Sequence, residues 1–146
     1  PYLKADEDRT RDLRQRYGQK AGGRLVVGIS WTGGNKDPVC RKRPPLADWW
    51  PLLETPDVCF VDLQYGETGA DRNAIREATG VDLVHNDAID ALTSMENFAA
   101  QVMAVDLVIT VGTSTAELAG ALGQETWVLV PFAAKWYWGA EGTSCL

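Results

Sequence analysis

The feature that most constrains the fold is a regular alternation of short apolar runs with segments of helical pattern. The first run is LVVGIS, and a helical segment separates each later run from the one before it. Strands in this arrangement are joined by crossover helices, which place a parallel sheet between two helical layers. The sequence therefore predicts an α/β, doubly wound, Rossmann-like domain of about five strands, at residues 25–30, 58–64, 81–84, 106–111 and 126–130.

The expected helices lie between these runs and ahead of the first one. The leading segment, ADEDRTRDLRQRYGQK, is charged throughout, with Leu13 and Tyr17 as its sizeable apolar residues. It reads as a solvated helix, so residues 1–23 are interpreted as a linker or connecting helix and residues 24–146 as the Rossmann-like domain. Further helices are expected in LADWWPLL, at residues 68–79, in MENFAAQVMA and in STAELAGAL.

The net charge and the cysteine content argue against several classes of protein. The 146 residues carry a formal net charge of -6, which argues against a general nucleic-acid surface. Cys40, Cys59 and Cys145 are far apart and odd in number, a pattern that favours a reducing cytoplasm over a disulfide framework or a structural zinc site. No apolar run approaches the roughly 20 residues of a transmembrane segment, and none is typical of a signal peptide.

The stretch VGTSTAELAGALG, residues 111–123, has two interpretations. Gly112, Thr113, Ser114 and Thr115 could form a turn whose backbone N–H groups bind a diphosphate at a helix start. Ser114 followed by Glu117 is also a capping box, in which the two side chains satisfy the helix itself. Further along, Gly120 suggests a close contact with a neighbouring element, and Gly123 suggests a helix C-cap.

The loop SWTGGNKDPVCRKRPP concentrates basic residues in an otherwise acidic chain. Lys36, Arg41, Lys42 and Arg43 all follow the first expected strand. If that strand is central and neighbours the strand at 106–111, this loop faces the Thr113 turn, where a cation and a helix start could hold a diphosphate together. A basic run of this length is also typical of a solvated surface.

Three other features have simpler interpretations beside their functional ones. Asp6-Glu7-Asp8 matches a metal-binding DxD pattern, but its position favours acidic residues in a first helical turn, and no metal site is predicted. His85 follows an expected strand without a catalytic partner in view, which favours a surface or packing role. The aromatic residues 136–138 could cover a donor or pack against another domain.

Several ordered motifs together carry a family resemblance. GISWTGG, PPLADWWPLLETPDVCFVDLQYGE and VDLVITVGTSTAELAGALGQETWVLVPFAAKWYWG resemble the C-terminal, donor-binding half of GT-B glycosyltransferases of the heptosyltransferase-like family. The likeness is to the bacterial branch fused to tetratricopeptide repeats, and more distantly to O-linked N-acetylglucosamine transferases. It implies a nucleotide-diphosphate sugar as substrate, metal-independent chemistry without a cofactor, and a catalytic base in a preceding Rossmann half. The chain is therefore expected to be part of a larger protein and to be inactive alone.

The resemblance also implies site residues. Phosphate contacts are expected from Thr32 and Gly33, from the cation Lys42 or its neighbour Arg43, and from the turn at Gly112, Thr113, Ser114, Thr115 and Glu117. Ribose or base contacts are expected from Gln64, Glu67, Leu92 and Thr93.

Two positions depart from the family pattern. The family usually has an acidic residue at the position of Gly112 and a histidine at that of Glu117. A carboxylate in place of the histidine removes a donor and repels a diphosphate. The alternative function is therefore a degenerate, non-catalytic docking module attached to a helical repeat array, and a nucleotide-sugar epimerase shares the same architecture.

Overall fold

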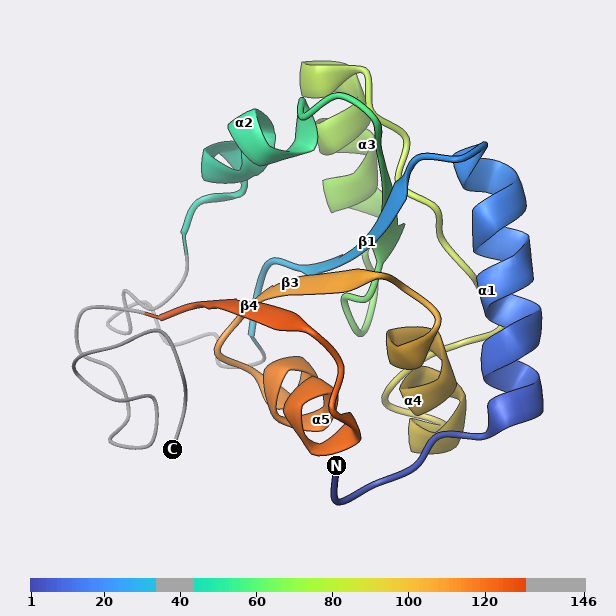
Figure 1. The fold of residues 1–146 in the computed structure, drawn as a ribbon. Helices are drawn as coiled ribbons and strands as arrows, with labels where there is room; N and C mark the ends of the chain where they lie inside the picture. The colour runs from blue at the N-terminus through green and yellow to red at the C-terminus, as the bar shows by residue number, and fades with distance from the viewer. Residues whose placement is uncertain (34–43, 131–146) are drawn as a thin grey trace.

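Four parallel strands form one sheet in the computed structural model, which describes residues 1–33 and 44–130. The strand order is β2-β1-β3-β4, and all three neighbouring pairs are parallel. The predicted α/β, doubly wound, Rossmann-like fold is confirmed, with the first strand at the centre as expected (Figure 1). The strands are β1 (Leu25–Ser30), β2 (Val58–Asp62), β3 (Leu107–Val111) and β4 (Thr126–Leu129).

Helices cover both faces of the sheet (Figure 1). Three helices share one apolar cluster with one face: α1 (Glu7–Ala21), α4 (Met95–Met103) and α5 (Ser114–Leu122). The other cluster joins the opposite face to the 3₁₀ turn η1 (Leu46–Trp49) and to the helices α2 (Trp50–Leu53) and α3 (Gly69–Thr79).

Alternation along β1 explains this division. Val26 belongs to the cluster under α1, α4 and α5, whereas Val27 and Ile29 belong to the cluster under α2 and α3. Successive side chains of a strand point to opposite faces, so an apolar run with no polar face is stable only where both faces are covered. The unbroken apolar character of LVVGIS therefore reflects its central place in the sheet.

One expected strand is reduced to a single bridge. Val84 pairs with Val61, and the segment around it forms no further rung with β2 within the described residues. Val84 donates to the Phe60 carbonyl at 2.8 Å and accepts from the Asp62 N–H at 2.9 Å. The neighbouring Asp82 is exposed, and α3 ends only at Gly80 in a left-handed C-cap. The run at 81–84 is therefore too short and too interrupted to continue the ladder.

Helix α1 is confirmed, and it packs on the domain through one face. Asp6 is its N-cap and accepts from the Arg9 N–H at 2.8 Å, while Glu7 and Asp8 lie in its first turn, where acidic residues were predicted. Leu13 and Tyr17 are buried in the cluster shared with α4, and the Gln101 amide donates to the Tyr17 hydroxyl at 3.0 Å. The solvated character that the sequence predicted applies to its charged face alone.

The two glycines expected to shape α5 have different outcomes. Gly123 is a left-handed C-cap with φ 75°, as predicted. The close contact expected at Gly120 is not made with the sheet or with any other described residue, because a Cβ built there would meet nothing within 4 Å among them. Within those residues, no helix has the length and apolar character needed to cross a bilayer.

Candidate functional site

The strand order reverses beside β1, which defines a switch point. The chain leaves β1 for β2 on one side and later enters β3 on the other side. Ser30 and Thr110 stand opposite each other at the carboxyl ends of β1 and β3, and both are fully buried. Ligands of open α/β sheets bind in the crevice beyond such a pair of strand ends. The residues that follow β1 and β3 are therefore the first candidates for a binding site.

The segments after these two strands approach each other closely. A Cβ built on Gly33, three residues after β1, would lie 3.2 Å from Cγ2 of Thr113, two residues after β3. The predicted proximity of the loop after the first strand and the Thr113 turn is thus confirmed at this pair. The basic residues Lys42 and Arg43 of the same loop lie outside the described residues.

Helix α5 begins at this crevice without a side-chain cap. Thr113 is the N-cap residue, and its side chain makes no capping hydrogen bond. Its carbonyl accepts from the N–H groups of Ala116 and Glu117 at 3.0 and 3.2 Å. The N–H groups of Ser114 and Thr115 have no hydrogen-bond partner in the part of the chain that the structure describes. The capping-box interpretation, with Ser114 as N-cap, is therefore wrong: the helix starts one residue earlier in register.

Two threonine hydroxyls behave differently in this turn. The Thr110 hydroxyl donates to the Val111 carbonyl at 2.9 Å and lies 3.5 Å from the Thr113 hydroxyl. The Thr115 hydroxyl is buried and has no partner among the described residues. A buried hydroxyl without a partner loses hydration without compensation, and such groups are uncommon in folded proteins. The first turn of α5 thus has unused donor capacity at the switch point.

A buried carboxylate organises the neighbouring end of β2. Asp62, the last residue of β2, has a side chain that is 0% exposed. Its Oδ2 accepts from the Thr68 hydroxyl at 2.7 Å, lies 2.9 Å from Nδ1 of His85 and lies 3.5 Å from Nε of Arg72. Its Oδ1 accepts from the Gln64 N–H at 2.9 Å. The carboxylate therefore has a partner for each oxygen, as burial of a charge requires.

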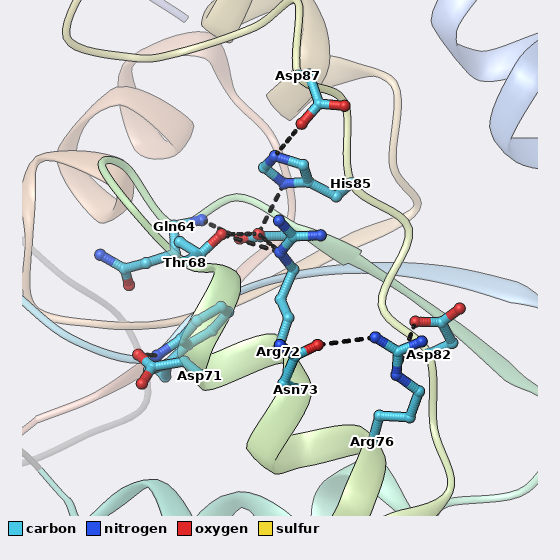
Figure 2. A network of polar contacts seen from close by, with 11 residues as sticks. Gln64, Thr68, Asp71, Arg72, Asn73, Arg76, Asp82, His85 and Asp87 are labelled. Atoms are coloured by element: carbon cyan, nitrogen blue, oxygen red, sulfur yellow. Dashed lines mark hydrogen bonds and ion pairs between the residues drawn. The ribbon is translucent and has the colours of Figure 1, made fainter.

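This network extends outward along α3 and the segment after Leu83 (Figure 2). Nε2 of His85 lies 3.3 Å from the exposed Asp87, so the imidazole stands between two carboxylates. Arg72 also donates to the Thr68 hydroxyl at 3.1 Å. In the first turn of α3, Asp71 accepts from the indole N–H of Trp31 at 2.9 Å. The start of α3 is thereby tied both to β2 and to the residue that follows β1.

The predicted ribose and base residues lie in two separate segments. Gln64 is buried just beyond β2, and its carbonyl oxygen already accepts two hydrogen bonds from the protein, whereas Glu67 is exposed in the turn before α3. Leu92 and Thr93 are exposed in the turn before α4, where Thr93 donates to the Asp90 carbonyl at 3.1 Å. Among the described residues, no hydrogen bond or ion pair joins these four side chains across the two segments.

Sequence reasoning missed the role of Asp62 and underrated His85. The signal at Asp62 is a carboxylate that ends an otherwise apolar strand, VCFVD, where a charge without partners would not be tolerated. Its partner His85 lies 23 residues later, a separation at which no local pattern links the two. Among the described residues, no group of three or more His, Cys, Asp or Glu side chains is arranged to hold a metal ion.

Comparisons with known proteins agree with this architecture. No protein-family profile matches the chain. The glycosyl transferase family 9 structure from Veillonella parvula DSM 2008 superposes with a TM-score of 0.70 and 13% identity, over 95% of this chain and 39% of that one. ADP-heptose LPS heptosyltransferase II of E. coli gives a TM-score of 0.63 and 16% identity, over 88% and 39%. The chain has part of a GT-B glycosyltransferase fold.

One curated relative is similar in sequence. Protein FlbA of Caulobacter vibrioides is 34% identical over 119 residues, which are 81% of this chain and 20% of FlbA. The chain therefore spans about a fifth of FlbA and about two-fifths of the two glycosyltransferase structures. The two glycosyltransferase structures support the resemblance to heptosyltransferase-like enzymes at the level of the fold.

Proposed function

We propose that this domain is the donor-binding half of a metal-independent GT-B glycosyltransferase, which transfers a sugar from a nucleotide-diphosphate sugar to an acceptor. The observation that carries the proposal is the first turn of α5: two N–H groups and the buried Thr115 hydroxyl lack partners among the described residues. They follow Thr113, which lies across the switch point from Gly33. Unpaired N–H groups at a helix start bind phosphate oxygens, and the helix dipole adds to the attraction.

The chemistry follows from where negative charge develops. As the bond from the sugar to the diphosphate breaks, charge accumulates on the departing phosphate oxygens, and donors already aimed at them lower the barrier. In the proposal, the Thr113 turn supplies those donors, and Lys42 or Arg43 supplies the cation. Glu67, Leu92 and Thr93 would contact the ribose or base. The acceptor site and catalytic base would come from a preceding Rossmann half of a longer protein.

Substitution of Thr115 by Val tests the proposal with little structural disturbance. Valine keeps the shape of threonine but removes a hydroxyl that has no described partner, so we expect unchanged or slightly higher thermal stability. If the hydroxyl contacts the donor, affinity for a nucleoside diphosphate should fall by about tenfold. Calorimetric titration with ADP, UDP, GDP and CDP measures this effect.

Thr126→Val is the matched control. Its hydroxyl donates to the Gln124 carbonyl at 2.9 Å at the start of β4, the end of the sheet opposite the crevice. This variant should lose some stability and keep the affinity of the unmodified chain. If no nucleoside diphosphate binds at millimolar concentration, or if both variants bind equally well, the proposed donor site is refuted.

A non-catalytic docking module is the second candidate, and Glu117 favours it. This residue places a carboxylate in the first turn of α5, where the resemblance implies a histidine. Such a module would associate with a neighbouring Rossmann half or with tetratricopeptide repeats and would bind no nucleotide. The same titration separates the two functions, because only the donor-binding half predicts heat from nucleoside diphosphates.

A further inference from the structure

The side chain of Gln64 connects the ends of β1 and β2. The last described backbone rung between these strands runs from the Leu63 N–H to the Ile29 carbonyl, at 2.9 Å. Beyond it, Oε1 of Gln64 accepts from the Thr32 N–H at 2.9 Å and from the Ser30 hydroxyl at 3.1 Å. A backbone N–H can only donate, so the atom of the carboxamide that faces Thr32 must be its oxygen. The side chain thus continues the ladder where the strands diverge.

Gln64 is itself held by the buried carboxylate of Asp62. The Gln64 N–H donates to Oδ1 of Asp62, while Thr68, Arg72 and His85 surround Oδ2. Gln64 is 9% exposed and Asp62 is 4% exposed, so water competes little with these contacts. Hydrogen bonds in a buried, fully satisfied network restrict the positions of their members. Residues at the start of α3 and His85 therefore hold Asp62 in place, and Asp62 in turn holds Gln64.

The segment that Gln64 holds leads directly to the switch point. Thr32 precedes Gly33, where an added Cβ would lie 3.2 Å from Cγ2 of Thr113. Movement of Thr32 would change the width of this opening, because Gly33 follows it immediately. The Gln64 side chain thus holds the residue immediately before this opening.

We infer that Gln64 is a positioning residue, whose carbonyl oxygen sets the place of Thr32 and Gly33 opposite the Thr113 turn and thereby the affinity for a nucleoside diphosphate. The affinity part of this inference rests on the proposed donor site, and the positioning part does not. The role differs from the direct ribose contact that the family resemblance implies, because the acceptor oxygen is directed into the protein.

Three variants test the inference. Gln64→Met keeps the length of the side chain and removes the acceptor, so exchange of the Thr32 amide hydrogen should become about tenfold faster. Gln64→Glu keeps an acceptor oxygen and should leave this exchange slow. Gln124→Met is the matched control, because its amide makes two hydrogen bonds, to the Val105 and Asp106 carbonyls, at the opposite end of the sheet. It should leave Thr32 exchange unchanged.

Exchange is measured residue by residue by NMR, and binding by calorimetric titration with the nucleoside diphosphate that the unmodified chain binds. Gln64→Met should weaken that binding by about tenfold, and Gln124→Met should not, although both variants lose two hydrogen bonds. A melting experiment on each variant checks that losses of stability are comparable. Only a positioning role predicts that affinity for the nucleoside diphosphate falls in the variant with faster Thr32 exchange and stays unchanged in the variant that loses stability alone.

The outcomes separate the two claims. Equal Thr32 exchange in Gln64→Met and the unmodified chain would refute the positioning role, as would equally fast exchange in the Met and Glu variants. Fast exchange with unchanged affinity would refute the link to the ligand. If the unmodified chain binds no nucleoside diphosphate but Thr32 responds as described, the proposed function fails and the positioning of the loop stands.

Discussion

Gly33 and Thr113 meet across the switch point: a Cβ on Gly33 would lie 3.2 Å from Cγ2 of Thr113. The two residues are 80 positions apart and follow the neighbouring strands β1 and β3. A side chain at residue 33 would therefore occupy the space between the β1 segment and the start of α5. The proposed donor site depends on that space remaining open.

Gly33→Val should weaken binding of a nucleoside diphosphate by at least about tenfold, because its methyl groups fill the gap. Gly33 is half-buried in a loop, so we expect a loss of stability of no more than about 1 kcal/mol. Gly69→Ala is the control, since a Cβ there meets nothing within 4 Å among the described residues. Titration and urea denaturation of both variants check this prediction, which unchanged affinity in Gly33→Val would contradict.

Gly28→Ala should destabilise the fold itself. A Cβ at this position in β1 would collide with Cδ1 of Leu63, lie 2.9 Å from its Cγ and lie 3.3 Å from Cγ2 of Val105. Overpacking of this kind costs about 1–3 kcal/mol. Shortening the neighbour in the double variant Gly28→Ala/Leu63→Val should recover part of the loss. Urea denaturation of the single and double variants measures the coupling, and purely additive losses would disprove a direct collision.

Asp62→Ala should destabilise the domain far more than Asp87→Ala, although both carboxylates contact His85. Asp62 is completely buried, and its removal leaves Thr68, Arg72 and the Gln64 N–H without their shared acceptor. We expect a loss of about 3 kcal/mol. The side chain of Asp87 is 98% exposed, so its removal should change the free energy of unfolding little. Comparable denaturation midpoints for the two variants would contradict this assignment.

Stability should decline at alkaline pH because of two buried acids. Burial raises the pKa of the Tyr17 hydroxyl above its ordinary value of 10.0, and burial also raises the pKa of the Cys59 thiol above 9.0. Each group keeps its proton longer in the folded chain than in the unfolded chain, so unfolding releases protons at high pH. The stability that these two protonated groups contribute is complete below pH 9. It is lost as the pH rises above 9.0 for Cys59 and above 10.0 for Tyr17.

Tyr17→Phe isolates one of these groups. Phenylalanine cannot ionise, so the free energy of unfolding should fall less steeply above pH 10 than in the unmodified chain. At neutral pH the variant should be less stable by about 1 kcal/mol, because the buried Gln101 amide loses its acceptor. Urea denaturation between pH 7 and 11 checks both effects. An identical pH slope in the two proteins would show that Tyr17 does not contribute.

Glu117→Gln should strengthen binding of a nucleoside diphosphate. The substitution removes a negative charge from the first turn of α5 and keeps the size of the side chain. We expect an increase in affinity of about threefold to tenfold at low ionic strength, which salt should diminish. Glu125→Gln, an exposed change next to the start of β4, is the charge-matched control. Equal affinities in the two variants at low salt would contradict a phosphate site at α5.

Local sequence patterns predicted most of the fold. They failed where a structural feature depends on residues that are distant in the sequence. The apolar runs located β1 and β3 within one residue, and Gly123 was recognised as a helix end from its position. The run at 81–84 was predicted to be a strand, but it pairs with β2 only through the single bridge between Val84 and Val61. The start of α5 shows the same limit, because the capping box predicted at Ser114 depends on a rotamer and a helix register that spacing does not specify.

The sequence by itself determined the parallel α/β architecture, because strand-length apolar runs between amphipathic helices can bury both faces only in this way. Only the tertiary structure decided that Gly33 meets Thr113, that Thr115 is buried without a described partner and that Asp62, Gln64 and His85 form one network. The physical reason is sequence separation: these contacts join residues that a folded sheet brings together, and no local propensity encodes their distance. The candidate site is therefore a property of the assembled strand ends.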